Sequence, residues 1–255
     1  MTMLLELEGV TKRFGGLTAL DGASLDVRQG EVRGLIGPNG SGKSTLFHVV
    51  TGVHRPDGGR ITFDGHPIAG RPTEAIAQLG LARTFQDIQL FYDMTVLENA
   101  MIGCHRLTRA GALAAMVGRR WVRAEEAAIV ERAMDALAVV GLADQAREPA
   151  RRIPYGHQRL LEIARALAAE PKLMILDEPA AGMNPSETRS LMDQIGRIVD
   201  RGVTVFLVEH NMKMVMDICQ RITVLNYGRV IATGTPTEVQ ADAQVIEAYL
   251  GGTAV

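Results

Sequence analysis

The sequence has few cysteines, few aromatic residues and no long apolar segment. Cys104 and Cys219 are the only cysteines among 255 residues, which favours neither a disulfide framework nor a zinc site. Aromatic residues make up 4%, which disfavours a platform for stacking nucleic-acid bases. The apolar run at residues 203–208 is far shorter than the roughly 18 residues that span a bilayer. Residues 1–6 show no basic segment followed by an apolar core, so we expect no signal peptide.

An excess of either charge is also lacking. Lys and Arg number 27 and Asp and Glu number 29, a formal net charge of −2, so a nucleic acid is not the expected partner. Hydrophobic residues make up 47% and charged residues 22%, values typical of a packed domain.

Strand and helix patterns alternate along the chain. Apolar or alternating segments predict strands at residues 4–10, 25–28, 32–36, 60–65, 172–176, 203–208, 222–225 and 229–232. Helical spacing predicts helices at residues 43–50, 124–140, 157–169, 186–200, 212–219 and 239–250. This alternation predicts an α/β fold with a largely parallel sheet covered by helices. We expect one domain over residues 4–250, with a core at about 4–94 and 159–250 and a helical subdomain at about 95–158.

A phosphate-binding motif occupies residues 37–44, which match G-x-x-x-x-G-K-[ST]. A predicted strand precedes it and a predicted helix follows, so backbone N–H groups and the helix dipole can converge on phosphate oxygens. Lys43, one of only four lysines, is expected to reach the β- and γ-phosphates, and the Ser44 hydroxyl is expected to bind Mg²⁺. The alternative, a glycine-rich turn without a ligand, is disfavoured because motif and context agree.

Two acidic residues end the predicted strand at 172–176. Asp177 is placed to hold the Mg²⁺ shell, and Glu178 is placed to polarise a water for in-line attack on the γ-phosphate. Two weaker candidates are His210, after the strand at 203–208, and Gln86, whose amide could ligate the metal or orient a water. Taken alone, each of these two is more often an ordinary polar residue.

The order of these motifs resembles that of the ATP-binding cassette family, in which a signature segment separates the phosphate loop from the acidic strand. The signature position here holds Tyr155-Gly156-His157-Gln158. Residues 13–16, 82–86, 177–185 and 245–251 resemble more narrowly the ATP-binding subunit of branched-chain amino acid importers, the LivG type. The resemblance covers residues 4–250. It implies a P-loop NTPase core with a mostly parallel sheet, an N-terminal antiparallel β part and a helical subdomain.

The resemblance also implies roles for single residues. The ATP-binding residues would be Phe14, stacked on adenine, and Gly37, Pro38, Asn39, Gly40, Ser41, Gly42, Lys43, Ser44 and Thr45 around the phosphates. Glu178 would be the catalytic base, His210 the γ-phosphate switch residue and Gln86 the sensor of metal and γ-phosphate. The Mg²⁺ ligands would be Ser44, Gln86 and Asp177.

Two segments would act across a dimer. The signature residues, which would contact ATP held by a second subunit, are Pro154, Tyr155, Gly156, His157 and Gln158. The loop of Gly182, Met183 and Asn184 would cross the dimer interface. The family's signature commonly reads Leu-Ser-Gly-Gly-Gln, so Pro154 removes a hydroxyl and a backbone donor, and Asn184 stands where an aspartate is usual.

The expected function is ATP hydrolysis coupled to import of branched-chain or hydrophobic amino acids. The implied partners are transmembrane permease subunits, a second ATPase subunit of the same or a different kind and, indirectly, an extracytoplasmic solute-binding protein. The implied place is the cytoplasmic face of the inner membrane. Ile88, Leu90, Phe91 and Tyr92 would suit a permease-docking patch, with simple core packing as the equal alternative. Another cargo (urea, lipid or lipopolysaccharide) stays open, and a nucleic-acid-linked ATPase is much less favoured.

Overall fold

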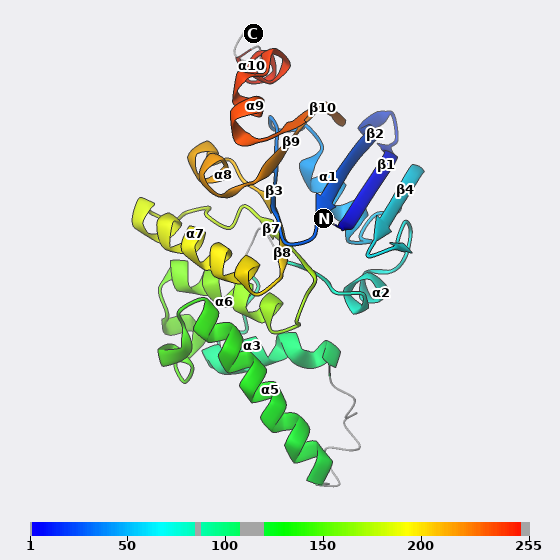
Figure 1. Ribbon diagram of the computed structural model, residues 1–255. Coiled ribbons are helices and arrows are strands. Elements are labelled where there is room, and N and C mark those ends of the chain that lie inside the picture. Colours follow the sequence, from blue (N-terminus) through cyan, green and yellow to red (C-terminus); the bar gives the residue numbers. More distant parts are fainter. Residues whose placement is uncertain (1, 85–87, 108–119, 251–255) are drawn as a thin grey trace.

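The computed structural model describes residues 2–84, 88–107 and 120–250, and two sheets form its framework (Figure 1). The antiparallel sheet has the order β2–β1–β4–β5, with β1 Met3–Phe14, β2 Leu17–Arg28, β4 Gly58–Phe63 and β5 His66–Pro67. The second sheet has the order β10–β9–β3–β8–β7–β6, with β3 Val32–Ile36, β6 Leu81–Arg83, β7 Leu173–Asp177, β8 Thr204–Val208, β9 Arg221–Asn226 and β10 Arg229–Gly234. All its neighbouring strands are parallel except β9 and β10.

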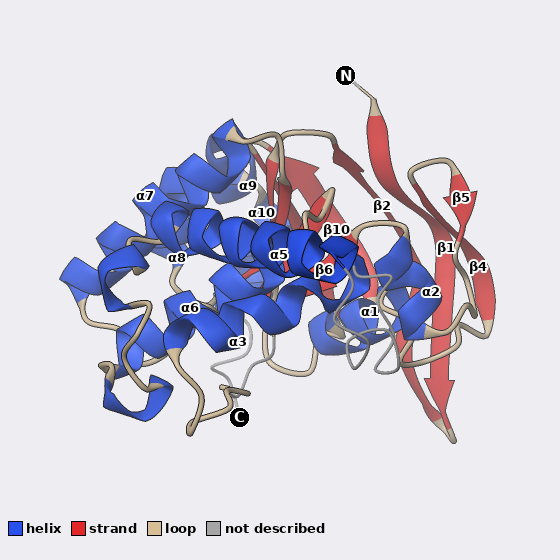
Figure 2. Ribbon diagram, turned by 90° about the horizontal axis from the view of Figure 1, so that it is seen from below, coloured by secondary structure: helices blue, strands red, loops and turns tan. Residues whose placement is uncertain are grey.

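The helices are α1 Lys43–Val50, α2 Thr73–Gln78, α3 Val96–Gly103, α5 Arg120–Val139, α6 Tyr155–Leu167, α7 Pro185–Asp200, α8 Met212–Ile218, α9 Pro236–Ala241 and α10 Ala243–Leu250. Short 3₁₀ helices lie at Cys104–Leu107, Ala143–Gln145 and Ala150–Arg152. Helices α3, α5 and α6 pack against one another, on the side of the molecule away from the antiparallel sheet (Figures 1 and 2).

The central strands β3, β7 and β8 are buried along their whole length. Their side chains alternate between two hydrophobic clusters, so that Ile175 and Phe206 face α1 and the antiparallel sheet while Met174 and Leu207 face the helices on the other side. Burial on both faces explains why β7 and β8 read as nearly continuous apolar runs rather than as alternating ones. The predicted α/β fold with a mostly parallel sheet and an N-terminal antiparallel part is confirmed.

The predicted helix at 239–250 is wrong in one respect, because two helices occupy this region. The Asp242 carboxylate accepts the backbone N–H groups of Gln244 at 2.8 Å and Val245 at 3.2 Å, and its extended backbone ends α9. An aspartate in this position caps a new helix, α10. The predicted hairpin turn is confirmed, and Tyr227 (φ 46°) and Gly228 (φ 77°) both have the positive φ that a tight two-residue turn requires.

The N-terminal cap of α7 is Asn184, two residues before the start of the helix predicted at 186–200. The Asn184 side chain accepts the backbone N–H groups of Ser186 at 2.9 Å and Glu187 at 3.0 Å, and the Glu187 carboxylate accepts the Asn184 N–H at 2.9 Å. This reciprocal capping box satisfies N–H groups that a helix start otherwise leaves unpaired.

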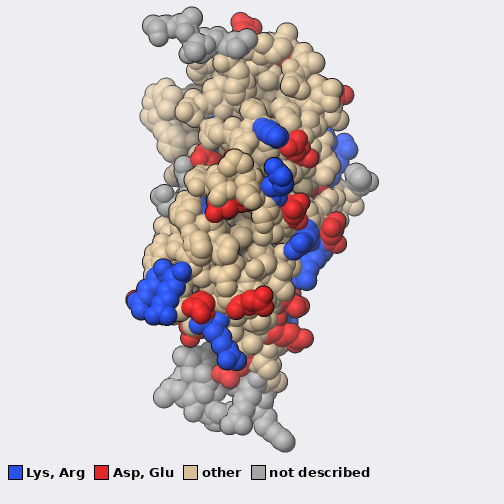
Figure 3. Space-filling model, turned by 90° about the vertical axis from the view of Figure 1, so that its left-hand side faces the viewer, with Lys and Arg blue, Asp and Glu red and all other residues tan. Residues whose placement is uncertain are grey.

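Charged side chains of both signs are interspersed on the face drawn in Figure 3. This distribution agrees with the near balance of Lys and Arg against Asp and Glu in the sequence. Across the described residues, none of the helices combines the length and the apolar character that crossing a membrane requires.

We expect Asn184→Ala to destabilise the protein by about 1 kcal/mol, because it removes the acceptor for two N–H groups at the start of α7. The free energy of unfolding is measured by urea titration. The matched control is Ser186→Ala, which leaves the capping box intact and is expected to change stability by less than about 0.5 kcal/mol. Equal effects of the two substitutions would contradict this cap assignment.

Candidate active site

The predicted phosphate-binding loop connects the end of β3 to the start of α1. Gly42 precedes α1 in the left-handed conformation (φ 106°), and no side chain caps the helix. The first turn of α1 contains no acidic residue. The first N–H groups of an α-helix have no partner within the helix and carry partial positive charge. The loop therefore presents donors and positive potential to an anion.

The loop is wound so tightly that two of its glycines have no room for a side chain. A Cβ atom on Gly37 would lie 2.1 Å from the carbonyl oxygen of Leu225, and one on Gly42 would lie 2.5 Å from that of Ala19. Both neighbours are backbone atoms of adjoining strands, so they cannot move aside easily. A Cβ on Gly40, in contrast, would meet no atom within 4 Å.

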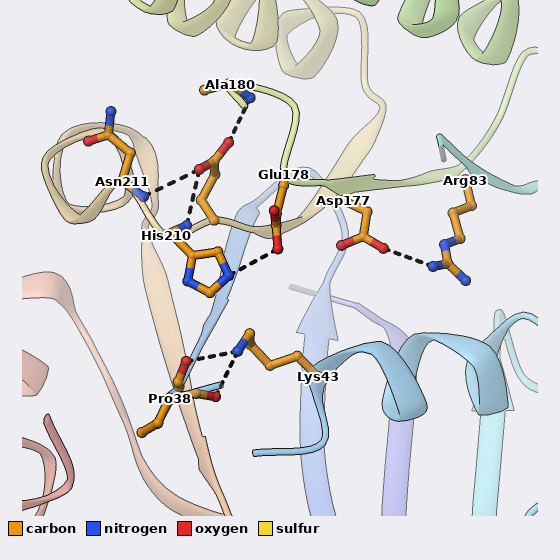
Figure 4. A network of polar contacts seen from close by, with 10 residues as sticks. Pro38, Lys43, Arg83, Asp177, Glu178, Ala180, His210 and Asn211 are labelled. Atoms are coloured by element: carbon orange, nitrogen blue, oxygen red, sulfur yellow. Dashed lines mark hydrogen bonds and ion pairs between the residues drawn. The ribbon is translucent and has the colours of Figure 1, made fainter. Parts of the chain in front are cut away.

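Lys43 is a buried cation without a carboxylate partner in the described part of the chain. Its Nζ donates to the carbonyl oxygens of Gly37 at 2.8 Å and Pro38 at 3.0 Å (Figure 4). Burial lowers the pKa of Lys43, and the charges of Glu178 and Asp177 oppose this shift. Within the described residues, the buried Ser41 hydroxyl of the same loop has no hydrogen-bond partner. An unpaired cation beside unsatisfied donors fits a phosphate group. Ser44 is exposed and Thr45 is half-buried, so both are open to a ligand.

The acidic residues lie at the same edge of the sheet as this loop. In the parallel register, Val208 of β8 pairs with Asp177 of β7 on one side and with Leu35 of β3 on the other. The carboxyl ends of the three strands therefore meet. Figure 4 shows that Asp177, Glu178, His210 and Lys43 surround one region, although they come from distant parts of the sequence.

Glu178 and His210 contact each other directly. His210 Nε2 lies 3.0 Å from Glu178 Oε1, and the two side chains are 49% and 23% exposed, respectively. Glu178 has a left-handed backbone (φ 49°), which is uncommon for a residue with a side chain, and its N–H donates to the Val208 carbonyl at 2.9 Å. A partly exposed carboxylate oriented by an imidazole can accept a proton from a water molecule.

Asp177 is buried and forms an ion pair that was not predicted, with Arg83 Nη2 at 2.8 Å from its Oδ2. A metal ion bound by Asp177 would share this carboxylate with the guanidinium. Of the other predicted metal ligands, Ser44 lies at the start of α1, and Gln86 lies outside the described residues. In the described part of the chain, no three or more His, Cys, Asp or Glu side chains are grouped so that they could hold a metal. The predicted ligand set contains only one such side chain and does not depend on such a group.

Phe14, the predicted adenine-stacking residue, lies at the end of β1 and is 42% exposed. Its ring packs edge-on against His54, with the centroids 5.2 Å apart, and His54 packs in the same manner against His48 of α1. Lys12 Nζ lies 5.2 Å from the centroid of the Phe14 ring. Phe14 thus offers an aromatic surface that is linked by ring contacts to the helix of the phosphate loop.

The predicted signature residues form the N-terminus of α6. Pro154 precedes the helix, which begins at Tyr155 rather than at the expected residue 157. His157 Nδ1 lies 3.1 Å from Gln145 Oε1, and the Gln158 amide donates to the Ile153 carbonyl at 3.1 Å. Among the described contacts, no hydrogen bond or ion pair joins residues 154–158 to residues 37–45. The signature segment therefore does not close the phosphate loop of its own chain.

The predicted dimer-crossing loop touches this signature segment. Gly182 has a positive φ of 78°, and a Cβ atom on it would lie 3.1 Å from Tyr155 Cε1. Gly156 approaches the same region, since its Cβ would lie 3.0 Å from Glu187 Oε1. Met183 packs against the hydrophobic core, and Asn184 caps α7. The structure thus brings the two predicted interface segments together on one surface of the chain.

Glu209 was not singled out from the sequence, although it is buried next to His210. Its carboxylate accepts the backbone N–H of Ala180 at 2.7 Å and that of His210 at 3.1 Å. Burial raises the pKa of Glu209, and these N–H donors oppose the shift. The available signal was that Glu209 follows β8 as Glu178 follows β7. Arg83 was also missed, because nothing local in the sequence marks it as the partner of Asp177.

The four residues of the predicted docking patch divide into two pairs. Leu90 is buried and Ile88 packs against the main hydrophobic cluster, whereas Phe91 and Tyr92 are 52% and 45% exposed. The core alternative therefore holds for the first pair, and the second pair presents an exposed aromatic surface.

Comparison with known protein families gives two matches. Residues 20–181 match the ABC transporter family, and residues 229–255 match a family described as branched-chain amino acid ATP-binding cassette transporter. The high-affinity branched-chain amino acid transport ATP-binding protein LivG of Salmonella typhimurium is 42% identical over 97% of this chain and 98% of its own. The corresponding protein BraF of Pseudomonas aeruginosa is 43% identical over the same shares.

Solved structures show the same relationship. A nucleotide-free ATP-binding cassette from an ABC transporter is 34% identical, with a TM-score of 0.84 over 97% of this chain and 99% of the other. An ATP-binding cassette in its ADP conformation is 33% identical, with a TM-score of 0.84 over 98% of this chain and 100% of the other. With these matches and a phosphate loop that faces acidic strand ends, the chain belongs to the ABC transporter family and is an ATP-hydrolysing nucleotide-binding subunit.

Proposed function

We propose that this ATPase drives import of branched-chain or other hydrophobic amino acids through a membrane permease. The observation that carries the catalytic part is the 3.0 Å contact of Glu178 with His210 at the strand edge that also holds Lys43. The cargo is supported by the family match of residues 229–255 and by the names of the LivG and BraF relatives.

The phosphates of ATP are bound by residues 37–45. The uncapped start of α1 supplies N–H donors, and Lys43 turns from the carbonyls of Gly37 and Pro38 to the β- and γ-phosphates. Phe14 stacks on the adenine. Ser44, Gln86 and Asp177 would hold Mg²⁺, which would supply positive charge against the charge that develops on the transferred phosphoryl group.

Hydrolysis is assigned to the Glu178–His210 pair. The Glu178 carboxylate accepts a proton from the water that attacks the γ-phosphorus, and His210 holds this carboxylate and contacts the γ-phosphate. Gln86 orients the water and senses the metal.

The complete site requires a second ATPase subunit. Residues 154–158 lie at a helix N-terminus and, among the described contacts, form no hydrogen bond or ion pair with the phosphate loop of their own chain, so we assign them to the ATP of the partner. Gly182 lies beside Tyr155, and we assign the loop of Gly182, Met183 and Asn184 to the interface. Because Pro154 has no N–H or hydroxyl, this contact depends more on Tyr155 and Gly156 than in cassettes with a Leu-Ser-Gly-Gly-Gln signature.

The permease subunits place this ATPase at the cytoplasmic face of the membrane, and a solute-binding protein delivers the amino acid to them from outside. The exposed pair Phe91 and Tyr92 belongs to the permease-docking surface. We assign residues 4–94 and 159–250 to the nucleotide-binding core and residues 95–158 to a helical subdomain, in which α3 and α5 pack together, while α6 (Tyr155–Leu167) crosses the boundary and packs against both.

Glu178→Gln is expected to lower the rate of ATP hydrolysis by about 100-fold or more, because an amide cannot take the proton of the attacking water. ATP affinity is expected to stay within about threefold, and ATP is expected to trap a dimer visible by light scattering. The matched control is Glu247→Gln, an exposed carboxylate on α10, which should hydrolyse at the normal rate. Near-normal turnover of Glu178→Gln would exclude Glu178 as the base.

Lys43→Ala is expected to weaken ATP binding by about 10- to 100-fold, since it removes a charge-assisted contact of about 1.5–3 kcal/mol. Its contact with phosphate exists in the ground state, so the dissociation constant, measured by nucleotide fluorescence, is the quantity that moves. Lys213→Ala, an exposed lysine at the start of α8, serves as the control and should bind ATP normally. An unchanged dissociation constant in Lys43→Ala would contradict the assigned role.

The transport assignment is tested by isolating the native complex in mild detergent through a tag on this chain and identifying its partners by mass. We expect two permease subunits and a second ATPase subunit, and we expect leucine-loaded binding protein to stimulate ATP hydrolysis. Permeases stimulated by urea or by a lipid instead would preserve the transporter and change the cargo. A nucleic-acid-bound complex without permeases would contradict the transport assignment.

A further inference from the structure

Glu209 is a buried carboxylate whose only described partners are backbone N–H groups. Its Oε1 accepts the N–H of Ala180 at 2.7 Å, and its Oε2 accepts those of His210 at 3.1 Å and Asn211 at 3.3 Å (Figure 4). The residue is 5% exposed. Within the described residues, no lysine or arginine forms an ion pair with it. Burial of a carboxylate is costly unless hydrogen bonds compensate for the lost hydration, so these contacts account for its presence.

The two oxygens of Glu209 bind two different segments. One segment follows β7 and contains Glu178 and Ala180, and the other follows β8 and contains His210 and Asn211. The Glu178–His210 contact bridges the same two segments through side chains. The two segments are therefore joined twice, once by the side chains of the catalytic pair and once by the buried Glu209 carboxylate.

We propose that Glu209 is a positioning residue for ATP hydrolysis, which holds the backbone of His210 and of Ala180 so that Glu178 and His210 meet. This inference rests on the proposed function of that pair. Glu209 itself does not touch nucleotide and moves no proton.

The position of Ala180 also determines where the predicted dimer-crossing loop begins. The Ala181 N–H donates to the Glu178 carbonyl at 3.1 Å, and the Met183 N–H donates to the Ala180 carbonyl at 3.1 Å. The backbone from Glu178 to Met183 thus forms successive short turns that lead into the dimer-crossing loop. Gly182, the first residue of that loop, lies so close to the Tyr155 ring that a Cβ atom on it would be 3.1 Å from Cε1. Displacement of Ala180 would accordingly move both the base and the loop.

Glu209→Gln tests the proposal with little change in volume. The amide replaces one acceptor oxygen by an NH₂ group, which then faces a backbone N–H, so one of the two segments loses its partner. We expect kcat to fall about 10- to 100-fold, since misplacement of catalytic groups by about 1 Å has effects of this size. ATP affinity is expected to stay within about twofold, because the phosphate loop is untouched.

The matched control is Glu238→Gln. The Glu238 carboxylate also accepts a backbone N–H, that of Thr235 at 2.7 Å, but it caps α9 and is exposed. We expect normal kcat. A similar fall in kcat in both variants would mean that loss of any such carboxylate slows the enzyme, and the proposal would be wrong.

A double-mutant cycle with His210→Ala separates positioning from general destabilisation. In single-turnover assays of the full-length chain, Glu209→Gln is expected to slow hydrolysis clearly less when His210 is already absent, because the share of its effect that acts through His210 is then already lost. An equal fall in both backgrounds would show that Glu209 does not act through His210. If Glu209→Gln melts below the assay temperature, Glu209→Asp, which keeps both acceptors on a shorter stem, is judged by the same criterion.

The same assays distinguish failure of this inference from failure of the proposed function. If Glu178→Gln abolishes hydrolysis while Glu209→Gln keeps normal kcat, the catalytic pair stands and the role of Glu209 is refuted. If Glu178→Gln retains turnover, the catalytic pair is wrong and the positioning role is refuted with it.

Discussion

The parallel pairing of β3, β8 and β7 is the constraint on which the rest of the structure depends. Val208 pairs with Leu35 on one side and with Asp177 on the other, so the ends of three strands that are far apart in sequence lie at one edge. All three strands are buried on both faces. A shift in their register would therefore disrupt the packing of side chains on both faces at once. The candidate catalytic residues Asp177, Glu178 and His210 lie where these strands end.

Each buried charge at this edge is compensated in a different way. Asp177 pairs with Arg83, and Glu209 accepts backbone N–H groups. Lys43 has carbonyl oxygens as its only partners in the part of the chain that the structure describes. Carbonyl dipoles compensate an ammonium less well than a carboxylate does, so Lys43 is the buried charge with most to gain from an anionic ligand. This difference explains how one edge of a sheet can hold stable ion pairs and still attract phosphate.

Local signals predicted β3 and α1 to the residue, because an apolar run, a glycine-rich motif and helical spacing follow one another without ambiguity. Most of β2 was missed, since Asp21 and Gly22 interrupt its pattern and its pairing with β1, which is not a local property, forms the strand. The break between α9 and α10 was hidden because apolar spacing continues across Asp242.

The same distinction applies to the site. Glu178 and Asp177 could be predicted because an acid after a buried strand is a recognisable pattern next to a phosphate loop. The bond of Glu209 to Ala180 could not, since it exists only when β7 and β8 are neighbours. Arg83 likewise becomes the partner of Asp177 only through the pairing of β6 with β7. Sequence patterns identify the residues that the chemistry requires, whereas the residues that hold them are determined by tertiary contacts.

The contacts that position the catalytic pair form a series that reaches the surface of the molecule. Glu209 joins His210 to Ala180, the turn at Ala180 leads to Gly182, and Gly182 lies against the ring of Tyr155 at the start of α6. Each link is a hydrogen bond to a backbone group or, at Gly182, an approach to Tyr155 that leaves no room for a side chain. In the proposed dimer, Tyr155 faces the ATP of the other subunit. The contacts that hold the catalytic pair and the segment assigned to the second ATP therefore form one continuous series within a single chain.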